Sequence, residues 1–139
     1  MSKSDTTHKT RAGDDAAVVV SGRLMTREAA ELTMLKFVVV LYRRPDLSPE
    51  AFFANLRDEH GPLAERIPGL RRYVQNHVLP DPKREHPGWD AVIELYWDDW
   101  DSMEAAWATP EGQAATNHLQ TLADLSRTTW SVVQEHVRR

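Results

Sequence analysis

The chain lacks cysteine altogether and has no long apolar run, and each absence excludes a class of protein. Without cysteine there are no disulfides, no thiolate catalysis and no cysteine-ligated metal. No stretch approaches the roughly 18 apolar residues of a membrane helix. The apolar run at Ala16–Val20 is too brief for a secretory signal. We therefore expect a cytoplasmic protein with no membrane partner.

The chain also lacks an excess of basic residues. Its net charge is -4 and its pI is about 5.8, whereas a nucleic-acid-binding protein needs a basic face. We therefore expect no nucleic-acid partner. With 139 residues, 41% of them hydrophobic and 27% charged, the composition is that of a soluble protein with a single globular domain.

Residues 1–33 differ from the rest of the chain. They are polar, carry charges of both signs and offer few large apolar groups to bury. This composition predicts a flexible N-terminal extension, followed by a folded domain over residues 34–139. The alternative is that Ala17–Val20 adds a strand to an exposed sheet edge of this chain or of a partner.

The most informative segment is Leu35–Tyr42, with the sequence LKFVVVLY. It is rich in β-branched and aromatic residues, which predicts a strand within residues 34–43. It does not alternate apolar with polar residues, so both of its faces favour burial. The chain has too few helices to cover both faces of a sheet. We therefore expect a homodimer, in which a second copy covers the remaining face.

The next segment predicts a helix that begins with Ser48 as N-cap and Pro49 in the first turn. Its apolar stripe consists of Phe52, Leu56, His60 and Leu63. Because Pro62 lacks a backbone N–H, we expect a bend near His60.

Further along, the sequence predicts two strands, then two helices, then a final strand. The sequence predicts strands at 70–79, 89–97 and 127–137, a loop at 80–88, a short helix capped by Asp98 or Asp99, and a helix that begins at Thr109 and buries Ala115, Leu119, Leu122 and Leu125. The order βαββαβ predicts the ferredoxin-like α+β fold, a four-stranded antiparallel sheet with helices on one face. Two such sheets can pack face to face as a homodimeric α+β barrel that encloses a cavity.

His60 is the first candidate catalytic residue. It lies on the apolar stripe of the first helix, where a histidine is either a core residue bonded to the backbone or a general acid or base. The third strand places Asp90, Glu94 and Tyr96 on the face opposite its tryptophans, either as a solvated surface or as the lining of a cavity. On a regular second strand Tyr73 and Asn76 point to opposite faces.

Aromatic side chains complete the list of candidates. Trp89, beside the loop, is the residue best placed to stack on an aromatic ligand. The candidate substrate-binding residues are Asn76, Trp89, Glu94, Tyr96 and Phe53. No histidine or carboxylate pair has the spacing of a zinc motif, and there is no Gly-rich phosphate loop or dinucleotide fingerprint. We therefore predict neither a metal nor a cofactor.

The motifs resemble those of the EthD-like family. They are Leu47–Phe52, Glu59–Leu63, Ile67–Val74, Trp89–Trp97 and Thr109–Gly112, and the resemblance extends over residues 34–137. It implies a dimeric α+β barrel. Members of the family are associated with ethyl tert-butyl ether degradation, in an auxiliary role, and with fungal polyketide decarboxylation or dehydration.

The resemblance also suggests site residues. Methylmuconolactone methylisomerase pairs a helix histidine with a tyrosine at the spacing of His60 and Tyr73, but its strand-three cysteine aligns with Leu95 here. We therefore expect a cofactor-independent lyase or isomerase that transfers protons on a small aromatic, polyketide or lactone-like metabolite. In this hypothesis His60 transfers the proton, Tyr73 donates to the developing oxyanion and Asp90 orients His60 or a water. The alternatives are a non-catalytic binding or accessory protein, and a haem-binding or quinol-oxygenating barrel.

Overall fold

A four-stranded antiparallel sheet forms the centre of the computed structural model, which describes residues 7–8, 17–20, 23–26, 34–85 and 88–139. Its strands are β4 (Leu35–Leu41), β5 (Arg72–His77), β6 (Ala91–Trp97) and β7 (Thr129–Val133), in the order β5-β6-β4-β7. Each strand pairs antiparallel with its neighbour. This is the ferredoxin-like arrangement, and the prediction of the fold class is confirmed.

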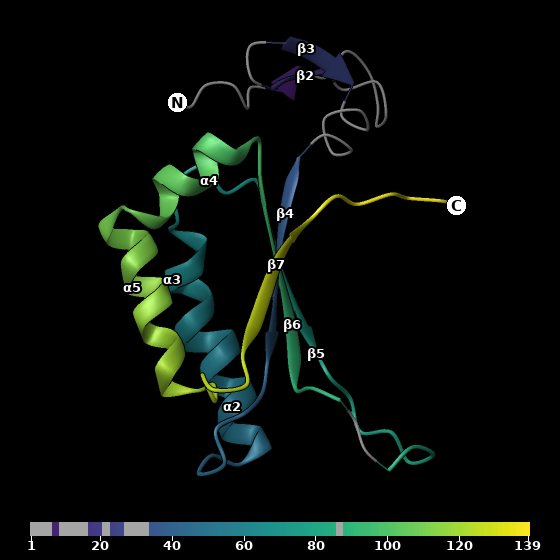
Figure 1. The fold of residues 1–139 in the computed structure, drawn as a ribbon, viewed down its shortest axis with the longest axis vertical. Helices are drawn as coiled ribbons and strands as arrows, with labels where there is room; N and C mark the ends of the chain where they lie inside the picture. The colour runs from purple at the N-terminus through teal and green to yellow at the C-terminus, as the bar shows by residue number, and fades with distance from the viewer. Residues whose placement is uncertain (1–6, 9–16, 21–22, 27–33, 86–87) are drawn as a thin grey trace.

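The described helices lie together on one face of this sheet (Figure 1). They are α2 (Pro49–Asn55), the π-helical turn η3 (Leu56–His60), α3 (Gly61–Glu65), α4 (Trp100–Trp107), α5 (Pro110–His118) and the 3-10 turn η4 (Leu119–Thr121). Three of them begin at the predicted caps, where Ser48, Asp99 and Thr109 accept hydrogen bonds from backbone N–H groups of the first turn.

The core lies between the helices and the sheet. The largest fully buried side chains are Trp97, Phe52, Leu41, Leu56, Met103 and Leu122. Two of these, Phe52 and Leu56, belong to the predicted stripe of the first helix, where His60 is buried with them. Leu125, predicted as buried, is 54% exposed because α5 ends at His118 and the chain turns away before it.

The first helical segment is interrupted where Pro62 was expected to bend it. Residues 56–60 form a π-helical turn, in which the backbone N–H of Gly61 donates to the Leu56 carbonyl. A proline cannot donate to the carbonyl four residues earlier, and its ring crowds that group. A turn with one extra residue accommodates both effects. The π turn therefore ends at His60 and fixes the direction of its side chain.

The strands are shorter than predicted, by up to several residues at each end. β7, for example, covers residues 129–133 rather than 127–137. In the N-terminal region, β2 (Ala17–Val20) is a strand, but it pairs with β1 (Thr7–His8) and β3 (Arg23–Thr26) in a separate sheet. Within this chain, then, Ala17–Val20 does not extend the four-stranded sheet. The remaining residues of the predicted extension lie outside the described ranges.

Among the residues that the structure describes, no helix combines the length and the apolar character needed to cross a bilayer.

Candidate functional site

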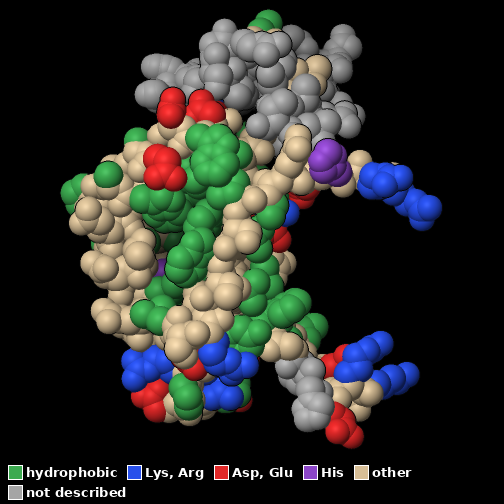
Figure 2. Space-filling model, in the orientation of Figure 1, with side chains coloured by type: hydrophobic (Ala, Val, Ile, Leu, Met, Phe, Trp, Pro, Cys, Tyr) green, Lys and Arg blue, Asp and Glu red, His purple; other side chains and the backbone are tan. Residues whose placement is uncertain are grey.

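A cavity of about 470 Å³ lies between the helices and the sheet. Figure 2 shows a hollow lined by hydrophobic side chains between the helical layer and strand β7. Trp130 of β7 stands at its border and is 64% exposed. The apolar lining includes the rings of Phe37 and Trp107 together with aliphatic side chains of β4 and β6. A volume of this size matches ligand pockets for small organic molecules.

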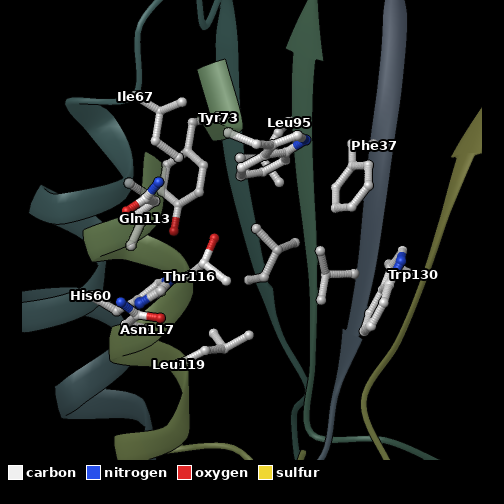
Figure 3. Close-up of a pocket in the computed structure, with 15 residues that line it drawn as sticks. Phe37, His60, Ile67, Tyr73, Leu95, Gln113, Thr116, Asn117, Leu119 and Trp130 are labelled. Carbon is white, nitrogen blue, oxygen red and sulfur yellow. The ribbon is translucent and has the colours of Figure 1, made fainter. Parts of the chain in front are cut away.

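Few polar side chains reach this cavity, and most of them come from the helices. The polar residues that line it are His60, Tyr73, Gln113, Thr116 and Asn117. In Figure 3 they face the sheet from the side of α5 and η3, except for Tyr73, which projects from β5. A few polar groups in an apolar pocket can orient a ligand and act on one part of it.

His60 is the most buried titratable group in the cavity wall, with 6% of its surface exposed. Its Nδ1 lies 3.2 Å from Nδ1 of His118, the last residue of α5. Burial, and secondarily the nearby His118, lower the pKa of His60 to about 4. The imidazole is therefore neutral at pH 7. One of the two Nδ1 atoms carries a proton, and the other accepts the hydrogen bond that this N–H donates.

Tyr73 is held by a neighbour on its own strand. Gln75 Nε2 donates to the Tyr73 hydroxyl oxygen at 2.9 Å and to the Leu56 carbonyl at 2.8 Å. The Leu56 oxygen can only accept, which fixes the orientation of the Gln75 amide. Gln75 Oε1 consequently accepts from His77 Nε2, at 2.8 Å.

This arrangement determines what the Tyr73 hydroxyl can do. Since its oxygen accepts from Gln75, its proton remains available to a molecule in the cavity, toward which the hydroxyl end of the ring points (Figure 3). Burial raises the pKa of Tyr73, and the hydrogen bond from Gln75 offsets only part of that effect. The phenol is therefore protonated at neutral pH and is a hydrogen-bond donor.

Gly61 gives Gln75 room to reach the π turn. A Cβ at position 61 would lie 3.2 Å from Gln75 Nε2 and 3.3 Å from the Leu56 carbonyl oxygen. Both distances are tighter than ordinary contacts, so a side chain there would displace the amide that holds Tyr73. The Gly61-Pro62 pair therefore serves the site as well as the helix.

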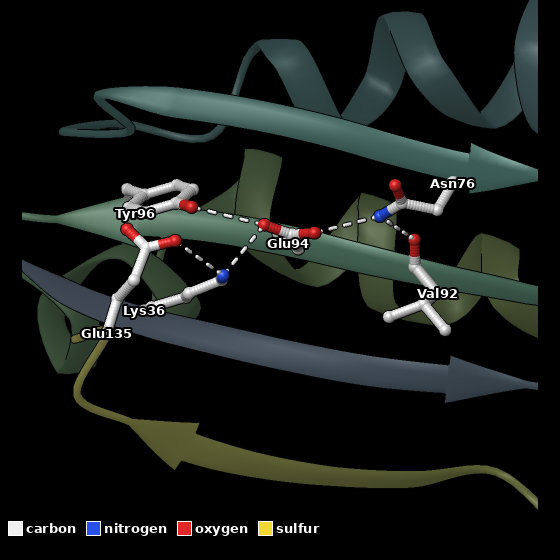
Figure 4. Close-up of polar contacts among 6 residues, drawn as sticks. All are labelled: Lys36, Asn76, Val92, Glu94, Tyr96 and Glu135. Atoms are coloured by element: carbon white, nitrogen blue, oxygen red, sulfur yellow. Dashed lines mark hydrogen bonds and ion pairs between the residues drawn. The ribbon is translucent and has the colours of Figure 1, made fainter. Parts of the chain in front are cut away.

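Three predicted substrate-binding residues lie on the opposite face of the sheet, away from the cavity. Asn76 Nδ2 donates to Glu94 Oε2 at 2.9 Å, and the Tyr96 hydroxyl donates to Glu94 Oε1 at 3.1 Å. Lys36 Nζ pairs with Glu94 at 2.9 Å and with Glu135 at 3.2 Å (Figure 4). Although partial burial opposes both effects, these contacts raise the pKa of Lys36 and lower that of Glu94.

The reason for this placement is the regular pairing of β5 with β6 from Arg72 to His77. Without a bulge, Tyr73 and Asn76 point to opposite faces, as the sequence predicted. The expectation that the face of Glu94 and Tyr96 lines the cavity of this chain does not match the structure. The cavity lies on the other face, that of Ile93 and Leu95.

The other candidates also lie outside the cavity wall. Asp90 Oδ2 accepts from the backbone N–H of Arg43 at 2.7 Å, so this carboxylate joins a loop to the start of β6. Asp90 was expected to orient His60, but the side chain that contacts the His60 ring is His118. Phe53 stacks on His77 with ring centroids 4.9 Å apart, and Trp89 is 45% exposed just before β6.

Metal ligands do not gather in this site. Within the described ranges, no group of three or more histidine, cysteine, aspartate or glutamate side chains could hold a metal ion. His60 and His118 form a pair, and the carboxylate of Glu59 is 4.0 Å from His118 Nε2.

Gln75 and His118 are functional candidates that the sequence did not reveal. Gln75 follows Tyr73 by two residues and shares its face, so strand alternation could have indicated it. His118 gives no such signal, because its contact with His60 joins residues 58 positions apart.

The family assignment follows from a model of the EthD domain that matches residues 44–126, which is more than half of the chain. The chain belongs to the EthD family. The matched part contains His60, Tyr73 and His118, but not β4 or β7. No curated protein matches this EthD chain.

Solved structures similar to this EthD chain share its fold. An ethyl tert-butyl ether D family protein from Bacillus halodurans is 29% identical, with a TM-score of 0.64 over 74% of this chain and 99% of the other. SnoaB, a cofactor-independent oxygenase from Streptomyces nogalater, is 17% identical, with a TM-score of 0.54 over 76% of this chain and 96% of its own. A dimeric ferredoxin-like protein of unknown function from Bacteroides fragilis is 16% identical, with a TM-score of 0.56 over 74% and 97%.

Proposed function

We propose that this EthD protein is a cofactor-independent lyase or isomerase. It transfers a proton on a small aromatic, polyketide or lactone-like carbonyl compound bound in the cavity. One observation carries the proposal: a neutral imidazole and a protonated phenol, His60 and Tyr73, line the same largely apolar cavity. Two groups whose surroundings move their pKa values apart are suited to act as base and acid.

The division of roles follows from the protonation states. His60 takes a proton from a carbon next to a carbonyl, because its ring is neutral and reaches the cavity. Tyr73 donates a hydrogen bond to the carbonyl oxygen, on which negative charge develops. That charge in turn favours a protonated His60, since an opposite charge nearby raises the pKa of an imidazole. Both groups belong to the chain itself, so the step requires no cofactor.

The lining supports the substrate class. The rings of Phe37, Trp107 and Trp130 border the cavity, so a flat aromatic ligand would find aromatic contacts on the side of the sheet and at the rim. The polar residues on the helix side can form hydrogen bonds with an edge of the ligand that carries oxygen atoms. A fused bicyclic ketone or lactone has both features.

The experiment measures solvent deuterium incorporation into 2-tetralone, 2-indanone and benzofuran-2-one by proton NMR. We expect the wild type to accelerate exchange at the carbon next to the carbonyl. His60→Gln should lose about 10²- to 10⁴-fold of that rate, and Tyr73→Phe about 10²- to 10³-fold. His136→Gln, at an exposed histidine near the C-terminus, is the matched control. Exchange that is equally fast in His60→Gln would contradict the proposal.

The same preparation decides between the alternatives. Quenching of tryptophan fluorescence by the three probes without catalysed exchange would indicate a binding or accessory protein. A Soret band on addition of haem, lost in His60→Gln, would indicate a haem-binding barrel. Oxygen consumption with a quinol would indicate an oxygenase, the activity named for the structurally similar SnoaB.

We further propose that the protein is a homodimer in which a second copy covers the face of the sheet without helices. On that face Val38 and Val40 of β4 are half-buried within a single chain. The charged groups there include Lys36, which pairs with Glu94 and Glu135, and Arg72, whose guanidinium lies over the Tyr96 ring. Burying this face therefore leaves no charge in that network without a partner.

Val38→Asp tests the dimer, because it places an unpaired carboxylate in the middle of the covered face. We expect sedimentation at micromolar concentration to give a dimer for the wild type and a monomer for the variant. Ala51→Asp, at an exposed position of α2, is the control and should stay dimeric. A folded wild-type monomer at this concentration would refute the proposal.

A further inference from the structure

We propose that His118 relays the proton that His60 removes from the substrate, so that the positive charge of the intermediate ends on His118. This inference rests on the proposed function. It adds a residue that takes up the positive charge, so that the buried His60 does not have to hold it. The contact that carries it is the 3.2 Å separation between the two Nδ1 atoms.

The geometry specifies the direction of transfer. With Nδ1 of His60 facing His118, Nε2 is the ring nitrogen left for the substrate, and it has no hydrogen-bond partner among the described side chains. In the resting state His60 carries its proton on Nδ1 and His118 accepts at its own Nδ1. His60 Nε2 then has a free lone pair.

The transfer balances in protons and electrons. The electron pair of the substrate C–H bond remains on the substrate as an enolate, whose oxygen accepts from Tyr73. The proton moves to His60 Nε2, and the proton on His60 Nδ1 moves to His118 Nδ1. His60 ends neutral in its other tautomer, and His118 ends as an imidazolium. Reversal of both transfers returns a proton to the same or another carbon, which is the outcome of an isomerisation.

The surroundings favour the charge on His118 over His60. His118 is the last residue of the nine-residue helix α5, where the helix dipole stabilises a cation. Its Nε2 lies 4.0 Å from Oε1 of Glu59, an exposed carboxylate. His60, by contrast, is buried against apolar side chains.

The other charged and titratable groups around the pair do not change this balance. On η3, Arg57 and Asp58 are exposed and neutralise each other through an ion pair at 3.0 Å. On β5, Tyr73 is neutral, and His77 is engaged with Gln75. On α3, the charge of Glu65 acts on Tyr73, whereas Glu59 contacts His118 itself, at 4.0 Å from Nε2.

The first test needs no substrate. Long-range nitrogen–proton NMR spectra at pH 7 distinguish the two tautomers of each histidine, with assignment by His60→Gln and His118→Asn. We expect His60 to be protonated at Nδ1 and His118 to be unprotonated there. A proton on Nε2 of His60 would overturn the relay, since no base would then face the substrate.

The second test separates a relay from simple positioning. An asparagine at position 118 can accept a hydrogen bond from His60 Nδ1–H and keep the ring oriented, but it cannot take up the proton. In the exchange assay with 2-tetralone, we expect His118→Asn to lower kcat by roughly a hundredfold, the low end of the range for general acid–base groups, with KM nearly unchanged. His136→Gln again serves as the control.

The outcomes distinguish this inference from the proposed function. If His60→Gln abolishes exchange while His118→Asn keeps the wild-type kcat, the relay is refuted and the proposed function stands. If the wild type catalyses no exchange with any of the three probes, the proposed function fails and the relay fails with it.

Discussion

The burial of His60 makes the stability of the protein depend on pH in a defined direction. The unfolded chain binds a proton at this residue near the ordinary pKa of 6.5, but the folded chain binds it only near 4. Between these values the unfolded state holds more protons, so lowering the pH favours unfolding. The contribution is complete above about pH 6.5 and is lost as the pH falls to about 4.

The magnitude follows from the same two values. A difference of one pKa unit corresponds to about 1.4 kcal/mol, so the whole gap from 6.5 to about 4 is worth about 3 kcal/mol. About 2 kcal/mol of this should be lost by pH 5. For a domain of this size, that is a substantial part of the free energy of unfolding.

Urea unfolding followed by tryptophan fluorescence measures this loss, at one fixed protein concentration so that association does not contribute. Other residues titrate in the same range, so the quantity of interest is the difference between the wild type and His60→Gln. Between pH 7 and pH 5 the wild type should lose about 2 kcal/mol more than the variant. His136→Gln should behave like the wild type. If the His60→Gln and wild-type curves were parallel, the buried neutral imidazole would be refuted.

Two further predictions concern close contacts that the fold creates. Gly112→Ala should lower the free energy of unfolding by several kcal/mol, since its Cβ would collide with a backbone carbonyl of α4; the matched Gly88→Ala, with open space around it, should be neutral in the same urea titration. Gln75→Leu removes the donor to the Tyr73 hydroxyl oxygen. It should therefore raise the pH at which the tyrosine ionises, measured by ultraviolet difference titration, and an unchanged titration of Tyr73 would contradict the assigned hydrogen bond.

Local sequence signals were sufficient to predict most of the fold. Ser48 and Thr109 could be assigned as caps, and the cap of the short helix could be narrowed to Asp98 or Asp99, because capping depends on a few neighbouring residues. The strand order followed from the element order, since short connections restrict the topologies of a βαββαβ chain. The ends of the strands were less predictable, because apolar residues continue beyond the last paired residue. Leu125 shows the same limit: helical spacing placed it in the core, but the helix had already ended at His118.

The site was harder to predict because strand alternation separates two faces without saying which one borders a cavity. The pattern of β6 correctly put Glu94 and Tyr96 together, opposite Ile93 and Leu95. A group of polar residues suggested chemistry, but in the chain they satisfy one another through Lys36 and Asn76. The face that borders the cavity is instead the apolar one, that of Ile93 and Leu95. A rule that looks for isolated polar side chains on apolar faces would have selected His60 and Tyr73 and left the carboxylates out.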